Sequence, residues 1–366
     1  MLLINDLLRH NQCIMEQLKD SIMTVLESGW YILGAQVKNF ENEFAAFCET
    51  AHCISVANGT DALELALRAL DVKQGDTVMT VANAGGYSTT AILAVGAIPQ
   101  YVEIDAETLL MSVDHLNQLI NIAKPRAIII THLYGQVAPV DKILSIVEPY
   151  GIPVIEDCAQ AHGARLQGRK VGSLAAMGCF SFYPSKNLGA LGDGGAITTQ
   201  DADIAARLQS LRQYGWKNKY EMIQKGGRNS RLDELQAAIL RAKLPHLEKW
   251  NQRRYDISLQ YIENIRHPLI KMQRIAQESY VGHLFVLRTS KRDALRAHLR
   301  EHAILSEIHY PTPDYLQPAM QDLFVDITLP ITENACAEIL TLPCFPEMTD
   351  EEIRNVINCV NDWTIL

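Results

Sequence analysis

The sequence predicts an α/β protein with a mostly parallel central sheet flanked by helices, followed by a smaller α+β part. Three observations lead to this prediction. Short apolar runs alternate with helical patterns over residues 53–155, as they do in a parallel sheet with crossover helices. A stretch rich in Leu, Ala, Glu, Arg and Lys follows at 231–265. The chain after about residue 267 mixes strand and helix patterns, which is typical of a small cap.

The elements of the first part come in a regular order. Strands are predicted at 53–57, 77–81, 99–104, 126–131, 152–156, 178–182 and 195–199. Helices are predicted at 60–70, 87–95, 112–122, 139–149 and 201–214. The segments between strands are long enough for βαβ units. We therefore expect a large domain over residues 1–245, which includes an N-terminal helix.

The stretch at 231–265 reads as one long helix, or as two helices broken near Pro245. It should bridge to a small domain over residues 246–366. In that domain the pattern predicts a strand at 283–288 and a helix at 291–302.

Length and composition exclude several classes of protein. With 366 residues, 48% hydrophobic and 20% charged, the chain reads as globular and can hold two domains. A net charge of −9 argues against general affinity for nucleic acids. Eight cysteines show no CxxC pair and no spacing typical of zinc or of a disulfide framework. The N-terminus lacks a signal-peptide pattern and there is no run of 18 apolar residues, so we expect a cytoplasmic protein without a metal or a membrane span.

The most informative stretch is CFSFYPSKNLGALGDGGAITT at 179–199. A predicted strand leads to Lys186 in a glycine-rich segment, where the backbone can approach a ligand closely. A lysine becomes a nucleophile when burial or a neighbouring cation lowers its pKa. The alternative is an ordinary exposed loop lysine.

A second candidate lies in PVIEDCAQAHGA at 153–164, where a predicted strand ends on Glu156 and Asp157. Ligands of open α/β sheets bind beyond the carboxyl ends of the strands, so a carboxylate there points at the site. Pyridoxal phosphate (PLP) needs an anion against its ring nitrogen. The alternatives are a helix N-cap for Asp157 and a structural ion pair for Glu156.

A third candidate is SVANGTDALELAL at 55–67, a strand, a tight turn and a helix start. The amides of Gly59 and Thr60 lie at the positive end of this helix, which suits a phosphate. A phosphate cup, a carboxylate and a lysine, each after a strand, together favour a PLP site.

These segments and nearly the whole chain resemble the DegT/StrS family of sugar aminotransferases, which are fold type I PLP enzymes. The matching segments are SGWYILG (28–34), FENEFAAFC (40–48), ANGTDAL (57–63), HLYGQ (132–136), EDCAQAHGA (156–164), SFYPSKNLGALGDGG (181–195) and GRNSRLDELQAAIL (227–240).

The resemblance implies a role for each cofactor-binding position. Lys186 matches the Schiff-base lysine of the family, and Asp157 matches the partner of the pyridine nitrogen. Gln160 matches a glutamine at the cofactor ring and its hydroxyl, although a surface glutamine is the simpler alternative. The phosphate positions are matched by Gly59, Thr60 and Ser181.

Asn229 matches an asparagine that reaches the phosphate in the neighbouring subunit. The resemblance therefore implies a homodimer with shared active sites. Asn229 could instead, or in addition, cap a helix.

Candidate substrate-binding residues come from two regions. The segment 212–231 carries six Lys and Arg against one acid, which suits a nucleotide diphosphate unless it is simply a solvated loop. Within it, Lys219 adds charge, and Tyr214 could stack on the ligand or contact its phosphates. Tyr183, His309 and Tyr310 could line a sugar pocket or pack in the core.

Two positions depart from the family pattern. Gly85 in VANAGGYSTTA stands where relatives carry an aromatic that stacks on the pyridine ring. Tyr87 could replace that aromatic, or the two glycines could open room for the substrate. Asp314 and Tyr315 follow IHYPTP where many relatives have a histidine, so sugar contacts there do not carry over.

The function implied is a ping-pong transamination with L-glutamate as amino donor. The acceptor would be a dTDP-linked 3-keto-6-deoxyhexose, giving a 3-amino-3,6-dideoxy sugar nucleotide for lipopolysaccharide or another glycoconjugate. The alternatives are amination at C4, a non-catalytic PLP-binding sensor, and a sugar dehydratase of the same fold. Members of the dehydratase branch typically have His where this chain has Lys186.

Overall fold

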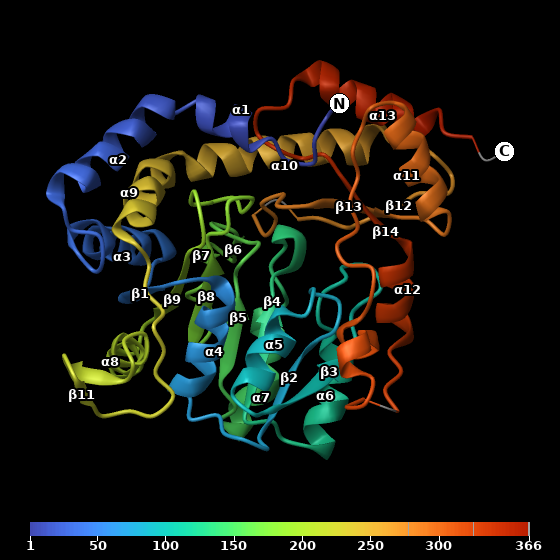
Figure 1. Ribbon diagram of the computed structural model, residues 1–366. Coiled ribbons are helices and arrows are strands. Elements are labelled where there is room, and N and C mark those ends of the chain that lie inside the picture. Colours follow the sequence, from blue (N-terminus) through green and yellow to red (C-terminus); the bar gives the residue numbers. More distant parts are fainter. Residues whose placement is uncertain (277, 325, 365–366) are drawn as a thin grey trace.

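The computed structural model describes residues 1–364 except 277 and 325. Its centre is a seven-stranded sheet in the order β1-β9-β8-β5-β4-β2-β3 (Figure 1). Every predicted strand of this sheet is confirmed, with ends that move by at most two residues. The strands are β1 (His52–Val56), β2 (Thr77–Val81), β3 (Ile98–Val102), β4 (Ala127–Thr131), β5 (Val154–Asp157), β8 (Met177–Ser181) and β9 (Gly195–Thr199).

Five neighbouring strands, from β3 to β8, run parallel, and β9 runs antiparallel to both β8 and β1. The reversal follows from the connection, because a loop without a crossover helix joins β8 to β9. The carboxyl ends of β4, β5 and β8 therefore meet at one edge of the sheet.

Helices cover both faces of the sheet. Along β4, Ile128 and Ile130 face one core, whereas Ala127 and Ile129 face the other. Burial on both sides is typical of parallel strands. The first core is covered by α3 (Ala35–Cys48), α6 (Val113–Ile122), α7 (Val140–Val147) and α9 (Glu234–Lys243), and the second by α4 (Gly59–Ala69), α5 (Tyr87–Ala94) and α8 (Ala202–Leu211).

The break predicted near Pro245 is confirmed. Helix α9 ends at Lys243, a short 3-10 turn spans Leu244–His246, and α10 (Leu247–Asn264) continues from it. Helix α10 runs across the upper side of the molecule towards the C-terminal part (Figure 1).

The C-terminal part is α+β, as predicted. Side chains of α10, α11 and α13 form one core with β13, for example Ile257, Leu295, Val356 and Phe285. Its elements are β12 (Lys271–Met272), β13 (Phe285–Arg288), α11 (Arg292–Glu301), α12 (Pro330–Glu338), β14 (Ile339–Leu342) and α13 (Asp350–Asn361).

The start of the chain also contacts the C-terminal part. Leu2 pairs with Ile304, and Arg9 in α1 (Leu7–Gln12) forms an ion pair with Glu352 at 2.8 Å. Helix α2 (Met15–Ser28) packs instead on α9. The division into two domains at residue 245 stays a prediction.

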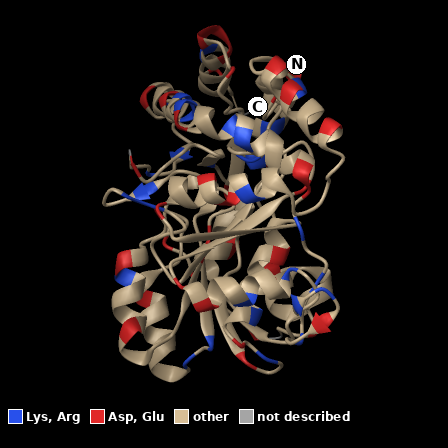
Figure 2. Ribbon diagram, turned by 90° about the vertical axis from the view of Figure 1, so that its left-hand side faces the viewer, with Lys and Arg blue, Asp and Glu red and all other residues tan. Residues whose placement is uncertain are grey.

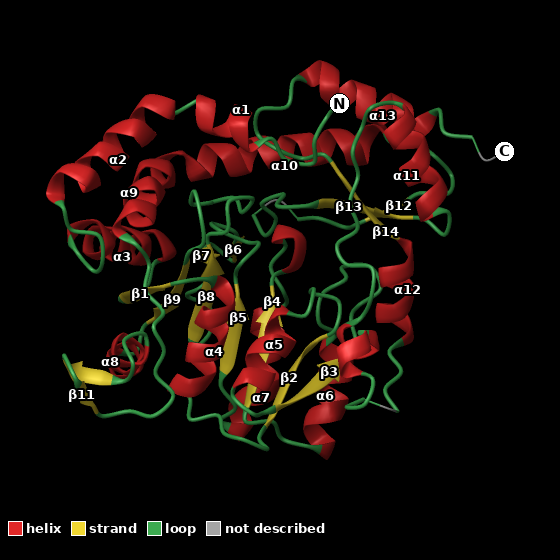
Figure 3. Ribbon diagram, in the orientation of Figure 1, coloured by secondary structure: helices red, strands yellow, loops and turns green. Residues whose placement is uncertain are grey.

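Two small hairpins complete the strands of the described residues, β6 (Arg165–Leu166) with β7 (Arg169–Lys170) and β10 (Trp216–Asn218) with β11 (Glu221–Met222). Figure 3 shows loops gathered between the sheet and the C-terminal strands. Of the helices in the described residues, none is long and apolar enough to cross a membrane.

Candidate active site

A pocket of about 780 Å³ opens at the carboxyl ends of β4, β5 and β8 and reaches the C-terminal part. It brings together segments from ten places in the chain, between Leu3 and Cys344. Nine of the twelve predicted site residues line it: Gly59, Thr60, Asp157, Gln160, Ser181, Tyr183, Lys186, His309 and Tyr310.

Asp157 is the last residue of β5 and is 6% exposed. Its carboxylate accepts hydrogen bonds from the Ala159 amide at 3.1 Å and from the Thr131 hydroxyl at 3.4 Å. Burial raises the pKa of Asp157, while the Ala159 amide and the positive charge of Lys186 oppose this rise. A buried carboxylate with so few donors is suited to hold a cationic ring nitrogen.

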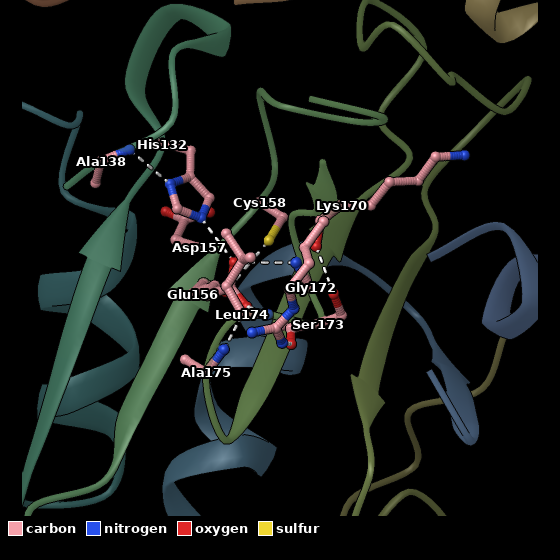
Figure 4. Close-up of polar contacts among 12 residues, drawn as sticks. His132, Ala138, Glu156, Asp157, Cys158, Lys170, Gly172, Ser173, Leu174 and Ala175 are labelled. Carbon is pink, nitrogen blue, oxygen red and sulfur yellow. Dashed lines mark hydrogen bonds and ion pairs between the residues drawn. The ribbon is translucent and has the colours of Figure 1, made fainter. Parts of the chain in front are cut away.

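Glu156 has a different role. Its oxygens accept hydrogen bonds from His132 Nε2 at 2.9 Å and from the amides of Gly172, Leu174 and Ala175 at 2.9–3.0 Å (Figure 4). His132 Nδ1 accepts in turn from the Ala138 amide at 3.0 Å. Glu156 therefore ties β5 to the loop at 172–175, which is a structural role. Its contact with His132 is a hydrogen bond rather than the predicted ion pair, because His132 Nδ1 accepts from an amide.

Lys186 lies in a loop that a buried asparagine anchors. Asn187 Nδ2 donates to Asn251 Oδ1 at 2.9 Å and to the Val281 carbonyl at 3.0 Å. Asn187 Oδ1 contacts His283 Nδ1 at 2.9 Å. These contacts hold the residue beside Lys186, so the lysine is presented to the pocket from a fixed backbone.

The amine of Lys186 is suited to nucleophilic chemistry. Burial lowers the pKa of Lys186 from its usual 10.5 to about 8, and the nearby carboxylate of Asp157 opposes this shift. A larger fraction of the amine is then unprotonated near neutral pH than for an exposed lysine.

The predicted phosphate cup lies at the start of α4. Asn58 caps this helix by accepting from the Asp61 amide at 2.8 Å, and Gly59 and Thr60 are its first residues. The first amides of a helix have no partner within the helix and lie at its positive end. A Cβ on Gly59 would lie 2.6 Å from the Cβ of Ser181. Only glycine lets the helix start come this close to β8.

Tyr310 occupies the space beside Gly85. A Cβ on Gly85 would lie 2.8 Å from Cε1 of the Tyr310 ring, and the φ of Gly85 is +82°. The hydroxyl of Tyr310 accepts from Gln160 Nε2 at 3.2 Å, and Gln160 Oε1 accepts from the Tyr134 amide at 2.7 Å. Tyr87 packs edge-on against Tyr310, with ring centroids 6.2 Å apart. Gly85 therefore accommodates an aromatic ring that a distant segment supplies.

Two histidines near Lys186 are uncharged at neutral pH. Burial and the charge of Lys186 lower the pKa of His309 to about 4, and its Nδ1 lies 2.9 Å from the Thr341 hydroxyl. Burial also lowers the pKa of His283, which lines the pocket. His283 and its partner Asn187 were not predicted from the sequence, because a histidine after a single glycine carries no recognisable signal.

Three predicted residues, Tyr214, Lys219 and Asn229, do not line this pocket. Asn229 pairs with Gln213 in an isolated bridge, and Lys219 lies at the tip of the β10–β11 hairpin. In Figure 1 this hairpin lies beside α8, at the far edge of the molecule from β3. The roles predicted for these three residues stay predictions.

The basic segment at 212–231 has fewer free cations than the sequence predicted. Arg212 is buried and forms an ion pair with Glu41, and Arg228 pairs with Glu64 at 2.7 Å. Figure 2 shows acidic and basic residues interspersed over this side of the molecule. The positive charge available to a diphosphate is smaller than a count of residues suggests.

Comparison with known proteins identifies the family. The model of the DegT/DnrJ/EryC1/StrS aminotransferase family matches residues 12–361. The dTDP-3-amino-3,6-dideoxy-alpha-D-galactopyranose transaminase of Aneurinibacillus thermoaerophilus is 45% identical, over 98% of both chains. The dTDP-3-amino-3,4,6-trideoxy-alpha-D-glucose transaminase of Streptomyces venezuelae is 41% identical, over 94% of this chain and 91% of the relative. A crystal structure of S. venezuelae DesV with a ketimine intermediate superimposes with a TM-score of 0.96 at 39% identity, covering 99% of this chain and 98% of that one.

The pocket fits the cofactor of these enzymes. It combines a lysine of lowered pKa, a buried carboxylate and a helix N-terminus within one cavity. The expectation of a PLP-dependent transaminase with an α/β fold is therefore confirmed. The chain belongs to the DegT/DnrJ/EryC1/StrS aminotransferase family.

Proposed function

We propose that this aminotransferase transfers an amino group from L-glutamate to C3 of a dTDP-linked 3-keto-6-deoxyhexose. The product is a 3-amino-3,6-dideoxy sugar nucleotide. The observation that carries this proposal is the match, over more than nine-tenths of the chain, to two relatives named as dTDP-3-amino sugar transaminases. Other relatives, at 37% identity, are named for UDP-linked sugars. The experiment must therefore also compare the nucleotide bases of dTDP and UDP.

Each of the pocket residues has a separate role in the proposed reaction. Bound PLP supplies an electron-withdrawing ring that stabilises negative charge on the carbon bearing the amino group. Lys186 Nζ binds the cofactor and then moves a proton as general base and acid. Asp157 keeps the ring nitrogen protonated, and the amides of Gly59 and Thr60 hold the phosphate together with Ser181. Gln160 orients the ring through its fixed side-chain amide.

The sugar lies between two anchors. Tyr183, His309 and Tyr310 surround its ring, and Lys219 and Tyr214 of a second chain hold the diphosphate. The distance between the diphosphate anchor and Lys186 then decides which ring carbon reaches the amine. Neutral His309 can donate or accept a hydrogen bond without adding charge beside Lys186.

The active form in this proposal is a homodimer with shared sites. Exposed apolar side chains support a second copy on this side of the molecule: Trp30 is 63% exposed, Tyr220 is 78% exposed and Met222 is 66% exposed. Burying them against a second chain would remove a large apolar area from water. Asn229 lies outside the pocket of its own chain, as a residue serving the neighbouring pocket must.

Subunit mixing tests the shared site. Lys186→Ala and Asn229→Asp subunits, each inactive alone, should recover activity when mixed, because one site of the mixed dimer escapes both lesions. The new carboxylate of Asn229→Asp repels the phosphate only in the neighbouring pocket. Heterodimers that form without activity would contradict the proposal.

A substrate panel tests the reaction. The enzyme, PLP and glutamate are incubated with 3-keto and 4-keto 6-deoxyhexoses on dTDP and on UDP, and the products are identified by mass and NMR. Faster amination of the 4-keto sugar would refute the C3 assignment and leave the aminotransferase assignment intact. Replacing glutamate by other amino acids tests the donor.

One alternative has an observation in its favour. A relative at 43% identity is named as an erythromycin biosynthesis sensory transduction protein. A protein that only senses PLP would keep its cofactor absorption when glutamate is added, whereas a transaminase loses it.

We also place the enzyme in the cytoplasm, in keeping with its eight free cysteines.

A further inference from the structure

Three potential metal ligands meet in the C-terminal part, away from the active-site pocket. His298 and His302 lie one helical turn apart at the end of α11, and Cys359 lies on α13. One ligand atom from each lies within 4.8 Å of the other two. The two imidazole rings are 4.4 Å apart between centroids. Imidazole nitrogen and thiolate sulfur are the donors that Zn²⁺ prefers in proteins.

The two helices that carry these residues are held in a fixed relation. Leu295 and Leu299 of α11 pack in the same core as Val356 and Val360 of α13. Ligands on packed helices keep their spacing better than ligands on loops.

Each imidazole already uses one nitrogen on a backbone carbonyl. His298 Nε2 lies 3.0 Å from the carbonyl oxygen of Cys359, and His302 Nδ1 lies 2.9 Å from that of His298. A carbonyl can only accept, so these nitrogens carry the protons and the second nitrogen of each ring keeps a lone pair. Histidines that bind metals almost always donate their other N–H to such an acceptor.

A second group of potential ligands, His132, Glu156 and Cys158, is arranged differently. Both nitrogens of His132 are engaged, by Glu156 and by the Ala138 amide. The oxygens of Glu156 also take three backbone amides (Figure 4). That group is satisfied by the protein itself, whereas the histidines of α11 keep donor atoms unused.

Solvent and a carboxylate are available to complete the coordination. The three side chains border an open hollow of about 520 Å³, which Asp6 and Asp362 also line. His302 is exposed, so its ring can move. Tetrahedral zinc, with bonds of about 2.0–2.3 Å, holds its ligand atoms about 3.3–3.6 Å apart. The ligand atoms, which lie within 4.8 Å of one another, therefore have to close by at most about 1.5 Å. Side-chain rotation of His302 can change its own distances to the other two ligands.

We propose that His298, His302 and Cys359 form a zinc site that joins α11 to α13, with water or Asp362 as the fourth ligand. Binding replaces the S–H bond of Cys359 with an S–Zn bond and releases the proton to the solvent. An ordinary cysteine thiol has a pKa of about 8.5, so it carries this proton near neutral pH before the metal arrives.

Calorimetry on the holoenzyme tests the site. The protein is stripped with EDTA, dialysed and titrated with Zn²⁺ in two buffers of different ionisation enthalpy. We expect one ion bound per chain, with a heat that differs between the buffers because a proton is released. Titration with Co²⁺ should produce visible bands of tetrahedral geometry and a near-ultraviolet thiolate band.

Variants assign the ligands. Losing a residue that only supports a metal ligand typically weakens metal binding about 10–100-fold. Losing the ligand itself should cost at least as much, so Cys359→Ser and His302→Asn should each weaken zinc binding at least about tenfold. Cys13→Ser removes an exposed thiol elsewhere and should leave binding unchanged. Zinc should raise the Tm of wild type and Cys13→Ser only.

Three outcomes would overturn the proposal: no zinc bound above a surface background, equal affinity in Cys359→Ser, or equal affinity in His302→Asn. His302 is exposed, so its variant keeps the test valid if Cys359→Ser fails to fold. The thiolate band must also disappear in Cys359→Ser, which a merely structural role of this cysteine does not require.

Discussion

Replacement of Gly85 by alanine tests how Tyr310 reaches the pocket. Gly85 and Gly86 have nearly the same positive φ, +82° and +80°. They differ in what a new side chain would meet. A Cβ on Gly85 would lie 2.8–3.0 Å from three carbons of the Tyr310 ring, whereas a Cβ on Gly86 would have no heavy atom within 4 Å. Gly86→Ala is therefore a matched control for backbone strain.

The expected magnitudes follow from this difference. A non-glycine residue with positive φ costs about 1–2 kcal/mol, which applies to both variants. Overpacking against a fixed side chain adds about 1–3 kcal/mol, and only for Gly85→Ala. The ring of Tyr310 cannot retreat freely, because its hydroxyl is bonded to Gln160 and Tyr87 packs on its edge. We expect Gly85→Ala to be less stable than Gly86→Ala by about 1–3 kcal/mol.

Urea unfolding followed by circular dichroism measures these free energies, at equal protein and PLP concentrations. The kcat/KM for the keto sugar should fall more in Gly85→Ala than in the control, because Tyr310 is displaced. In a Tyr310→Ala background, Gly85→Ala should cost no more than Gly86→Ala. Equal losses in the two single variants, or an excess loss that persists without the Tyr310 ring, would refute the reasoning.

Three further predictions concern the pocket. Lys186→Ala should fold and lose transamination, because the cofactor anchor and the proton carrier are the same amine. Turnover at the wild-type rate in this variant would exclude Lys186 as the Schiff-base lysine. Asp157→Asn should still bind PLP and lose most of its rate, since a neutral amide does not hold the ring nitrogen protonated; a near-normal rate would leave Asp157 only its structural contacts with the Ala159 amide and the Thr131 hydroxyl. PLP uptake by the apoenzyme should accelerate as the pH rises through about 8, because burial lowers the pKa of Lys186 to that value and only the neutral amine attacks. A midpoint near 10.5, the usual lysine value, would show that the amine is solvated.

Much of the fold and of the cofactor pocket followed from the order of residues alone. Strands such as 77–81 and 195–199 were predicted with the bounds that the structure has, because buried strands are short, apolar runs bounded by turn or helical patterns. Lys186, Asp157 and Gly59 could be placed together because each follows a strand and such strand ends meet at one edge of the sheet.

Tertiary structure decided the contacts between segments that are far apart in the chain. Tyr310 fills the space beside Gly85, and His283 holds Asn187 next to Lys186. Glu41 neutralises Arg212, which the sequence had assigned to a diphosphate. The histidines of α11 meet Cys359 although no spacing typical of zinc links them. Periodicity reveals which side of a helix or strand is apolar, because it depends on neighbours a few residues away. It carries no information on which element packs against that side, and the partner of a side chain is set by that packing.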